Sequence, residues 1–446
     1  MRITLALIGL LAAALPLAAQ SNNSYLIRGA TVYPVSGPKV ENASVLILDG
    51  KIADIGDAKL AAPKARKDVK VVEAKGLHVY PGMIDSASEV GIAEIGSIRE
   101  TSDTGEIGTF NPQLRPLIAV NPDSEHIPVT RANGITSVMV LPAAAGGGGR
   151  GGGGGSIIAG QVSLINLNGW TWEEMEVKRD AAVYLRFPVI AGGGGGRGFG
   201  GGGRGAGAGG GGFAEARRAY EAQVRTIHTF FEEARRYQRA KKAGDPSLKT
   251  DLKLEAMLPV LEGQRPVMMV VTREREIRDA IEFADKEKIK IVLAGVRRPG
   301  KALELIKSKN IPVILGSTLA LPLEEDDPYD SAFTLPGELH KAGVKFAFAS
   351  FDNQFARNLP YEAAQAAAFG LPYEEALKSI TLNAAEIWGV GDQYGSIDKG
   401  KYANLMVTDG DPLEIKTQVK MVFIKGQQVD LESKHTKLYK RYLARP

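Results

Sequence analysis

Residues 79–88 read VYPGMIDSAS, an apolar run interrupted by a Pro-Gly pair and followed by a polar end. The apolar residues predict a buried strand, and the polar end marks the point at which that strand stops. In α/β proteins the carboxyl ends of parallel strands hold the functional side chains. Asp85, Ser86 and Ser88 are therefore the first candidate site residues.

Apolar strands alternate with helical patterns through the middle of the chain. The strands are expected at 134–142, 265–271, 289–295, 311–316 and 344–350. They are apolar throughout, which is typical of a parallel sheet covered by helices on both faces. This pattern predicts a (β/α) barrel, with a doubly wound open sheet as the alternative.

Both ends of the chain carry short alternating runs with Gly and Asp-Gly turns, which predict antiparallel strands. We expect residues 22–78 and 394–432 to form one small β domain, and residues 79–393 to form the barrel. Glycine-rich insertions at 146–155 and 191–212 interrupt the barrel. Glycine tracts lose much backbone entropy on ordering and bury little surface, so we expect both to be mobile loops. The less favoured interpretation is that their arginines contact nucleic acid, as RGG segments do.

Composition limits the function classes. The chain has 446 residues and no cysteine, which excludes thiol catalysis and thiolate metal sites. A net charge of only +4 argues against nucleic acid as a partner. Residues 1–19 resemble a signal peptide, which predicts export to the periplasm or the exterior, with an uncleaved anchor as the alternative. The sequence contains no second long apolar run, so we expect no membrane span in the mature chain.

The titratable residues form few patterns that are typical of a catalytic or metal-binding site. The five histidines show no zinc-ligand spacing. Carboxylates are better placed, because Asp85 ends the first strand and Asp352 follows the last. Such groups can act as general bases or bind a hard cation, and the alternative is that they cap turns.

The stretch GLHVYPGMIDSAS, residues 76–88, resembles the end of the first barrel strand in the metal-dependent amidohydrolase superfamily, particularly its imidazolonepropionase-like and dihydroorotase-like branches. Residues 380–389 (ITLNAAEIWG) and 394–413 (YGSIDKGKYANLMVTDGDPL) resemble that family's closing segments. The resemblance implies a (β/α)8 TIM-like barrel with a small β-sandwich built from both termini. It also implies a hydrolase of non-peptide C–N bonds, in a cyclic amide, an imide or an N-acyl amino acid.

The resemblance also implies where the metal ligands would lie. The first-strand histidines correspond to Ser86 and Ser88, and the fifth- and sixth-strand ligands fall near Val270 and Gly295. Asp352 matches the last-strand aspartate and is a possible residual ligand. This pattern predicts a degenerate metal site, with no cofactor unless the family's zinc or another divalent metal persists.

Three functions stay open. The first is an exported hydrolase of C–N bonds. The second is a catalytically silent barrel that binds a small molecule or a protein partner, such as a related active amidohydrolase. The third is an enzyme without the usual metal site that uses Asp352 together with Asp85, Glu89 or the acidic loop at 94–106.

Overall fold

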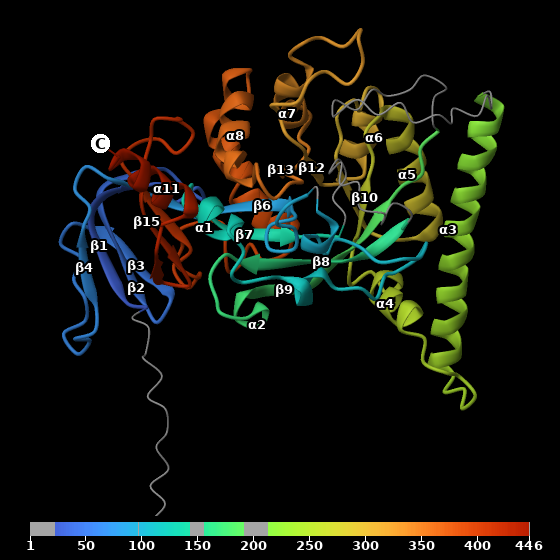
Figure 1. The fold of residues 1–446 in the computed structure, drawn as a ribbon, viewed down its shortest axis with the longest axis horizontal. Coiled ribbons are helices and arrows are strands. Elements are labelled where there is room, and N and C mark those ends of the chain that lie inside the picture. Colours follow the sequence, from blue (N-terminus) through green and yellow to red (C-terminus); the bar gives the residue numbers. More distant parts are fainter. Residues whose placement is uncertain (1–22, 97, 143–155, 191–212, 446) are drawn as a thin grey trace, which may run out of the picture.

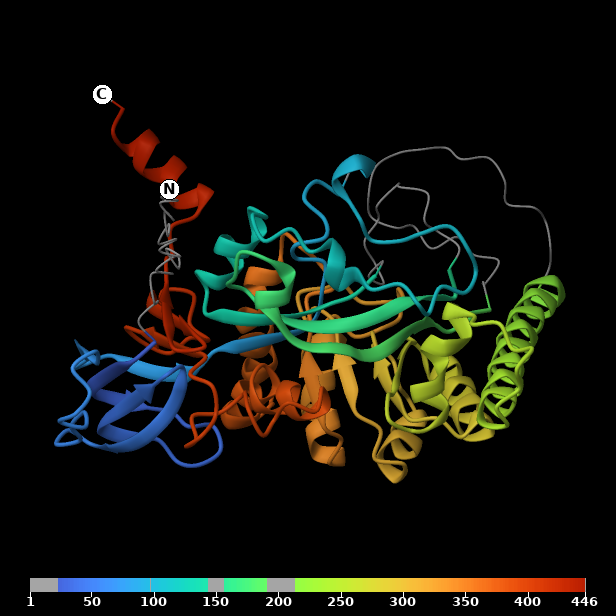
Figure 2. The ribbon, with the colours of Figure 1, turned by 90° about the horizontal axis from the view of Figure 1, so that it is seen from below.

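The computed structural model describes residues 23–96, 98–142, 156–190 and 213–445. The predicted signal peptide and both glycine tracts lie outside these residues. Two sheets of eight strands each account for all the described strands. The small sheet lies at one end of the molecule, and the long helix α3 lies at the other (Figures 1 and 2).

The larger sheet is a nearly closed barrel with the strand order β13-β12-β11-β10-β9-β8-β7-β6. Its strands follow the chain order from one edge to the other, as the sequence pattern predicts. Their bounds are β6 (Met83–Ser88), β7 (Ile135–Val140), β8 (Ile158–Asn166), β9 (Glu176–Arg186), β10 (Val267–Val270), β11 (Ile291–Ala294), β12 (Val313–Leu315) and β13 (Phe346–Phe348).

One barrel strand departs from the predicted (β/α)8 pattern. β8 pairs antiparallel with both β7 and β9, whereas all the other barrel pairs are parallel. A parallel connection needs a crossover segment, usually a helix. Between β8 and β9 the chain forms only the four-residue helix α2 (Trp172–Met175), so β9 returns beside β8 in the opposite direction.

Helices cover the outside of the barrel, as the alternating pattern predicts (Figure 1). The longest is α3, whose Ile227 and Phe231 are buried and lie four residues apart, on one face of the helix. It spans Phe213–Lys242. The other helices are α1 (His126–Arg131), α4 (Leu252–Leu261), α5 (Glu274–Glu287), α6 (Ala302–Ser308), α7 (Ser331–Ala342), α8 (Leu359–Ala368), α9 (Tyr373–Ser379), α10 (Leu382–Ile387) and α11 (Lys434–Leu443).

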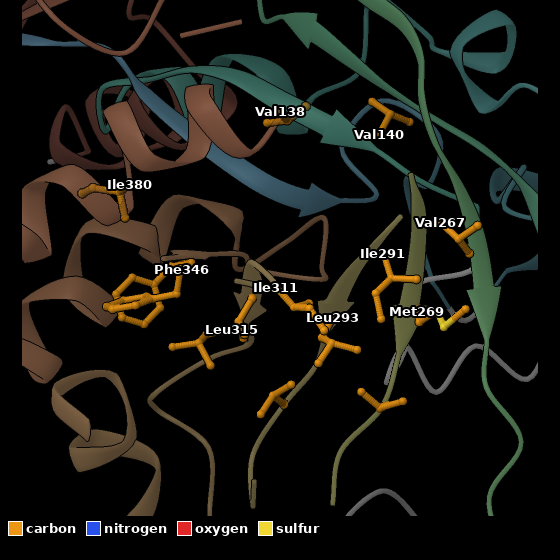
Figure 3. Close-up of a cluster of buried hydrophobic side chains, with 14 of the residues drawn as sticks. Val138, Val140, Val267, Met269, Ile291, Leu293, Ile311, Leu315, Phe346 and Ile380 are labelled. Carbon is orange, nitrogen blue, oxygen red and sulfur yellow. The ribbon is translucent and has the colours of Figure 1, made fainter. Parts of the chain in front are cut away.

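Strand residues alternate between two cores. On β10, Val267 and Met269 pack outward in a cluster that they share with Ile291 and Leu293 of β11 (Figure 3), whereas Met268 packs in a second cluster with Val292. The alternation follows from the pleat of a strand, which points successive side chains to opposite faces. One core therefore lies between strands and helices, and the other fills the barrel.

The small sheet is built from strands of both ends of the chain. Its order is β16-β15-β14-β5-β1-β2-β3, with β4 on β1. β5 lies between a strand from the first part of the chain and one from the last. The bounds are β1 (Tyr25–Val32), β2 (Val40–Leu48), β3 (Lys51–Asp57), β4 (Lys70–Glu73), β5 (His78–Pro81), β14 (Leu405–Thr408), β15 (Val419–Ile424) and β16 (Gln427–Val429).

The stretch 79–88 joins the two sheets. β5 ends at Pro81 in the small sheet and β6 starts at Met83 in the barrel, so the two sheets meet at Gly82. A Cβ on Gly82 would lie 2.3 Å from the side chain of Thr136 on β7. Only glycine therefore fits this contact without displacing its neighbour.

Among the described residues, none of the helices combines the length and the apolar composition that crossing a bilayer requires.

Candidate functional site

A cavity of about 560 Å³ lies at the carboxyl ends of the later barrel strands. We call it the mouth cavity. Val270 at the end of β10, Gly295 after β11 and Asp352 after β13 all line it, together with Arg297 and Ser350. The structure therefore brings together three of the residues singled out from the sequence. It lies where parallel α/β barrels hold their ligands.

Asp352 is partly exposed and spends one carboxylate oxygen on the local backbone. Its Oδ1 accepts hydrogen bonds from the backbone N–H groups of Gln354 at 2.5 Å and Phe355 at 2.8 Å. This is a turn-capping arrangement, the alternative role expected for such carboxylates. Its Oδ2 makes no hydrogen bond within the described residues, so a single oxygen is left for a ligand in the mouth cavity.

Asp85 is fully buried and is not among the residues that line the mouth cavity. Its Oδ1 accepts a hydrogen bond from the Ser350 backbone N–H at 2.9 Å, and its Oδ2 accepts one from the Ser350 hydroxyl. Burial raises the pKa of Asp85 to about 7, against the opposing effect of these hydrogen bonds. Asp85 thus joins β6 to the end of β13.

The two serines of the opening stretch behave differently. Ser88 donates a hydrogen bond from its hydroxyl to the backbone carbonyl of Asp352 at 2.9 Å. The Ser86 hydroxyl is buried with no hydrogen-bond partner among the described residues. Ala87, which lies between them, packs in the cluster that fills the barrel. A metal-binding side chain introduced at position 87 would therefore point to the interior.

Val270 and Gly295 place no metal-binding group at the mouth cavity. Val270 has an aliphatic side chain and Gly295 has none. Gly295 adopts a φ of +74°, a left-handed conformation that favours glycine. A Cβ there would lie 3.6 Å from Val270 Cγ1, so space exists for a side chain but the backbone conformation disfavours one.

Glu362 on α8 belongs to the same region, and the sequence analysis did not identify it. Its side chain is almost completely buried, and its Oε2 has no hydrogen-bond partner among the described residues. Burial raises the pKa of Glu362 to about 8, and the charges of Asp85 and Asp352 add to this effect. The helical run that contains Glu362 gives no signal that this residue turns inward.

The acidic loop that follows β6 is fastened to the same strand end. His126 Nε2 lies 2.9 Å from the Glu94 backbone carbonyl and donates to it, because a carbonyl oxygen can only accept. Asn353 donates its side-chain N–H to the Ala93 carbonyl at 2.7 Å. His126 and Asn353 therefore position this loop, and the Glu94 carboxylate keeps one buried oxygen without a partner among the described residues.

The donor set at the mouth does not fit a catalytic zinc ion. Such a site needs three strong protein ligands, usually histidine or carboxylate. Within the described residues no three His, Cys, Asp or Glu side chains gather in a way that could hold a metal ion. The sequence places every His, Asp and Glu of the chain in those residues.

Comparisons with known proteins agree with this architecture. The family model described as "Amidohydrolase family" matches residues 268–429. The amidohydrolase tasK of Hapsidospora irregularis is 25% identical over 449 residues, which cover 90% of this chain and 42% of that protein. This chain thus spans less than half the length of that relative.

Solved structures show the same fold. An amidohydrolase from Thermotoga maritima MSB8 superposes with a TM-score of 0.75 and 26% identity, covering 91% of this chain and 99% of that one. A prolidase crystallised with N-methylphosphonate-L-proline has a TM-score of 0.52 at 17% identity, covering 91% and 99%. The fold is thus that of an amidohydrolase barrel. Residues 268–429 thus resemble the amidohydrolase family, and the chain as a whole is similar in sequence and fold to amidohydrolases of the metal-dependent superfamily, whose members typically use a divalent metal such as zinc.

Proposed function

We propose that this amidohydrolase-family protein binds a small molecule with a non-peptide C–N bond in its mouth cavity and has lost the metal-dependent hydrolysis of its family. The observation that carries the proposal is the contrast between a formed cavity and its lining. The cavity has a volume suited to a small ligand. Val270 and Gly295 supply no ligating group to it, and Asp352 supplies one free oxygen.

Arg297 narrows the class of ligand. It lines the mouth cavity and makes no ion pair among the described residues, although its side chain donates to the Leu321 carbonyl. An unpaired guanidinium is suited to binding a carboxylate. Among the amides that the family resemblance suggests, an N-acyl amino acid carries such a carboxylate, whereas simple cyclic amides do not. We therefore propose an N-acyl amino acid as the ligand.

The binding half of the proposal is tested by titrating the purified protein with N-acetyl amino acids in a calorimeter. Arg297→Gln should weaken binding about tenfold, the effect of losing one charge-assisted hydrogen bond. Arg278→Gln is the matched control, because Arg278 is exposed on α5 and pairs with Glu274. Equal affinities of Arg297→Gln and the unmodified protein would remove Arg297 from the site.

The catalytic half is tested by metal analysis of protein purified without chelators. We expect well under one equivalent of zinc per chain, because the mouth lacks a tetrahedral donor set. A tightly bound, stoichiometric transition metal would overturn the degenerate-site proposal. Hydrolysis of the same N-acetyl amino acids should stay at the rate without protein.

A second candidate function is hydrolysis by carboxyl groups without the usual metal site. The raised pKa of Glu362, about 8, favours it, because a carboxyl group that is protonated near neutral pH can act as a general acid. Asp352 would then serve as the base. Hydrolysis that Asp352→Asn and Glu362→Gln each abolish would support this candidate, and hydrolysis that neither variant changes would exclude these residues.

We further propose that the protein acts outside the cytoplasm. The charged start and apolar run of residues 1–19 support this proposal. Recovery of the chain with a new N-terminus near residue 20, from a compartment beyond the cytoplasmic membrane, is the expected result. A chain that keeps Met1 in the cytoplasm would contradict it.

A further inference from the structure

A second and larger cavity, of about 850 Å³, lies at the other end of the barrel. We call it the base cavity. Its walls come from the segments that precede β10, β11 and β12, from the first half of β9, from helices α4 and α5 and from the end of α10. These segments lie at the amino ends of the parallel strands, so the base cavity opens opposite the mouth cavity.

The base cavity has an excess of positive charge. Five cationic side chains line it, against the carboxylates of Asp180 and Asp285. Two of the cations are neutralised locally, because Arg179 pairs with Glu176 at 2.6 Å and Lys309 pairs with Asp285 at 2.8 Å. The three that remain are Lys178, Arg265 and Lys290, and they face one carboxylate, Asp180.

Asp180 is already committed to another partner. Arg115 donates to it from Nε and Nη2, at 2.8 to 3.0 Å, whereas Arg265 lies 3.7 Å from it. Asp180 holds a φ of 50°, which is uncommon for a residue with a side chain. The aspartate therefore positions Arg265 at the cavity wall without neutralising it fully.

Lys178 and Trp388 each keep an N–H without an acceptor among the described residues. Lys178 donates to the carbonyls of Trp388 and Gly389 at 3.0 and 3.3 Å, which leaves the third N–H of its ammonium group. The indole N–H of Trp388, which also lines the cavity, is buried with no partner among the described residues. A buried donor without an acceptor is costly, and a bound acceptor would remove that cost.

Beside the uncharged polar residues Gln264 and Asn310, the wall also has apolar parts, which include Ile281, Ile289, Ile311 and Ile387. We propose that the base cavity binds a small organic anion, in which an apolar body contacts these side chains and a carboxylate or phosphate accepts from Arg265, Lys178 and Lys290. Both headgroups offer the same acceptor chemistry to this cluster. The site is separate from the mouth cavity and does not depend on the function proposed there.

The test uses the full chain in a Trp170→Phe, Trp172→Phe background, so that Trp388 is the only remaining tryptophan of the three. Its fluorescence reports on the base cavity directly. The probes are hexanoate and hexyl phosphate, with hexanol as the uncharged counterpart. We expect saturable changes with at least one of the two anions, with the tighter one identifying the preferred headgroup, and a much weaker response to hexanol.

Variants locate the binding. Arg265→Gln should weaken the preferred anion about tenfold and Lys290→Gln about threefold, according to their burial. Lys416→Gln, which removes an exposed charge elsewhere, should leave affinity unchanged. If Arg265→Gln does not fold, the exposed Lys290 still provides the comparison. Equal binding of hexanol, no saturable response to either anion, or equal losses in Lys290→Gln and Lys416→Gln would each overturn the proposal.

Discussion

Asp85 closes the barrel with its side chain. β6 and β13 stand at the two ends of the strand order, and they are joined by the Ser350–Asp85 hydrogen bonds and by Phe351 N–H to the Ala87 carbonyl at 2.8 Å. This geometry favours a structural role for Asp85.

Asp85 variants should separate the hydrogen bonds from the charge. Asp85→Ala should lower the free energy of unfolding by about 2–4 kcal/mol, because it leaves the Ser350 groups buried and unpaired. Asp85→Asn should cost less than about 1 kcal/mol, since its amide can accept from the Ser350 N–H and donate to the Ser350 hydroxyl. Urea unfolding measures both, and equal losses would contradict the closing role.

Glu362 should make stability depend on pH. Its pKa rises from 4.5 in the unfolded chain to about 8 in the folded chain, so the folded state keeps a proton that the unfolded state has lost. The contribution of Glu362 to stability is therefore fully present below about pH 4.5 and is lost as pH rises to about 8, by about 1 kcal/mol per pH unit. Asp85 adds a similar decline between 3.8 and about 7.

Urea unfolding of Glu362→Gln across this pH range gives the check. In this variant the decline of stability with rising pH should be shallower. It should stop above about pH 7, because the contribution of Asp85 ends there. Glu338→Gln, an exposed glutamate on α7, is the control and should follow the unmodified protein. A variant with the full slope would show that Glu362 is already ionised in the folded chain.

At this scale the sequence predicts positions better than environments. Asp352 was expected at the end of the last strand, and it lies at the mouth. Asp85 was also expected at a strand end, but its burial depends on Ser350, which is remote in sequence. Glu362 could not be identified, because its pKa arises from helix α8 packing over strand ends that come from elsewhere in the chain.

At the scale of secondary-structure elements, Gly82 determines how closely the two sheets can meet. Gly82→Ala should destabilise the protein by about 1–3 kcal/mol, because the new methyl group overlaps Thr136. Adding Thr136→Ala should recover part of that loss by removing the atoms at 2.3 Å, although the Thr136 Cβ at 2.8 Å would still be crowded. Thermal unfolding of the single and double variants measures the coupling, and additive losses would rule out this contact as the cause.

The later strands and helix α3 were predictable because each is marked by a clear apolar run or stripe. β8 and β9 were not predicted. β9 begins with the charged residues of EVKRD, and β8 follows a glycine tract. The reversal of β8 depends on the short link to β9, and hydrophobic periodicity carries no information on strand direction.

At the scale of the whole molecule, the strands that precede both glycine tracts end on the mouth side of the barrel. One follows β7 and precedes β8, and the other follows β9. Replacing residues 146–155 or 191–212 by short Gly-Ser linkers should change stability by less than about 1 kcal/mol, because loop-closure entropy varies slowly with length. Affinity of N-acetyl amino acids for the mouth should change, as calorimetry would show. Unchanged affinity in both variants would show that neither tract contributes to ligand binding in the mouth cavity.

The order of the small sheet has a consequence for how the chain folds during synthesis. β5 needs β14 as its second neighbour, and β14 is made only after the entire barrel sequence. Until then, the first strands present an open edge that could pair wrongly. The barrel can assemble in the meantime, and the arrival of β14–β16 then completes the sheet in which the chain began.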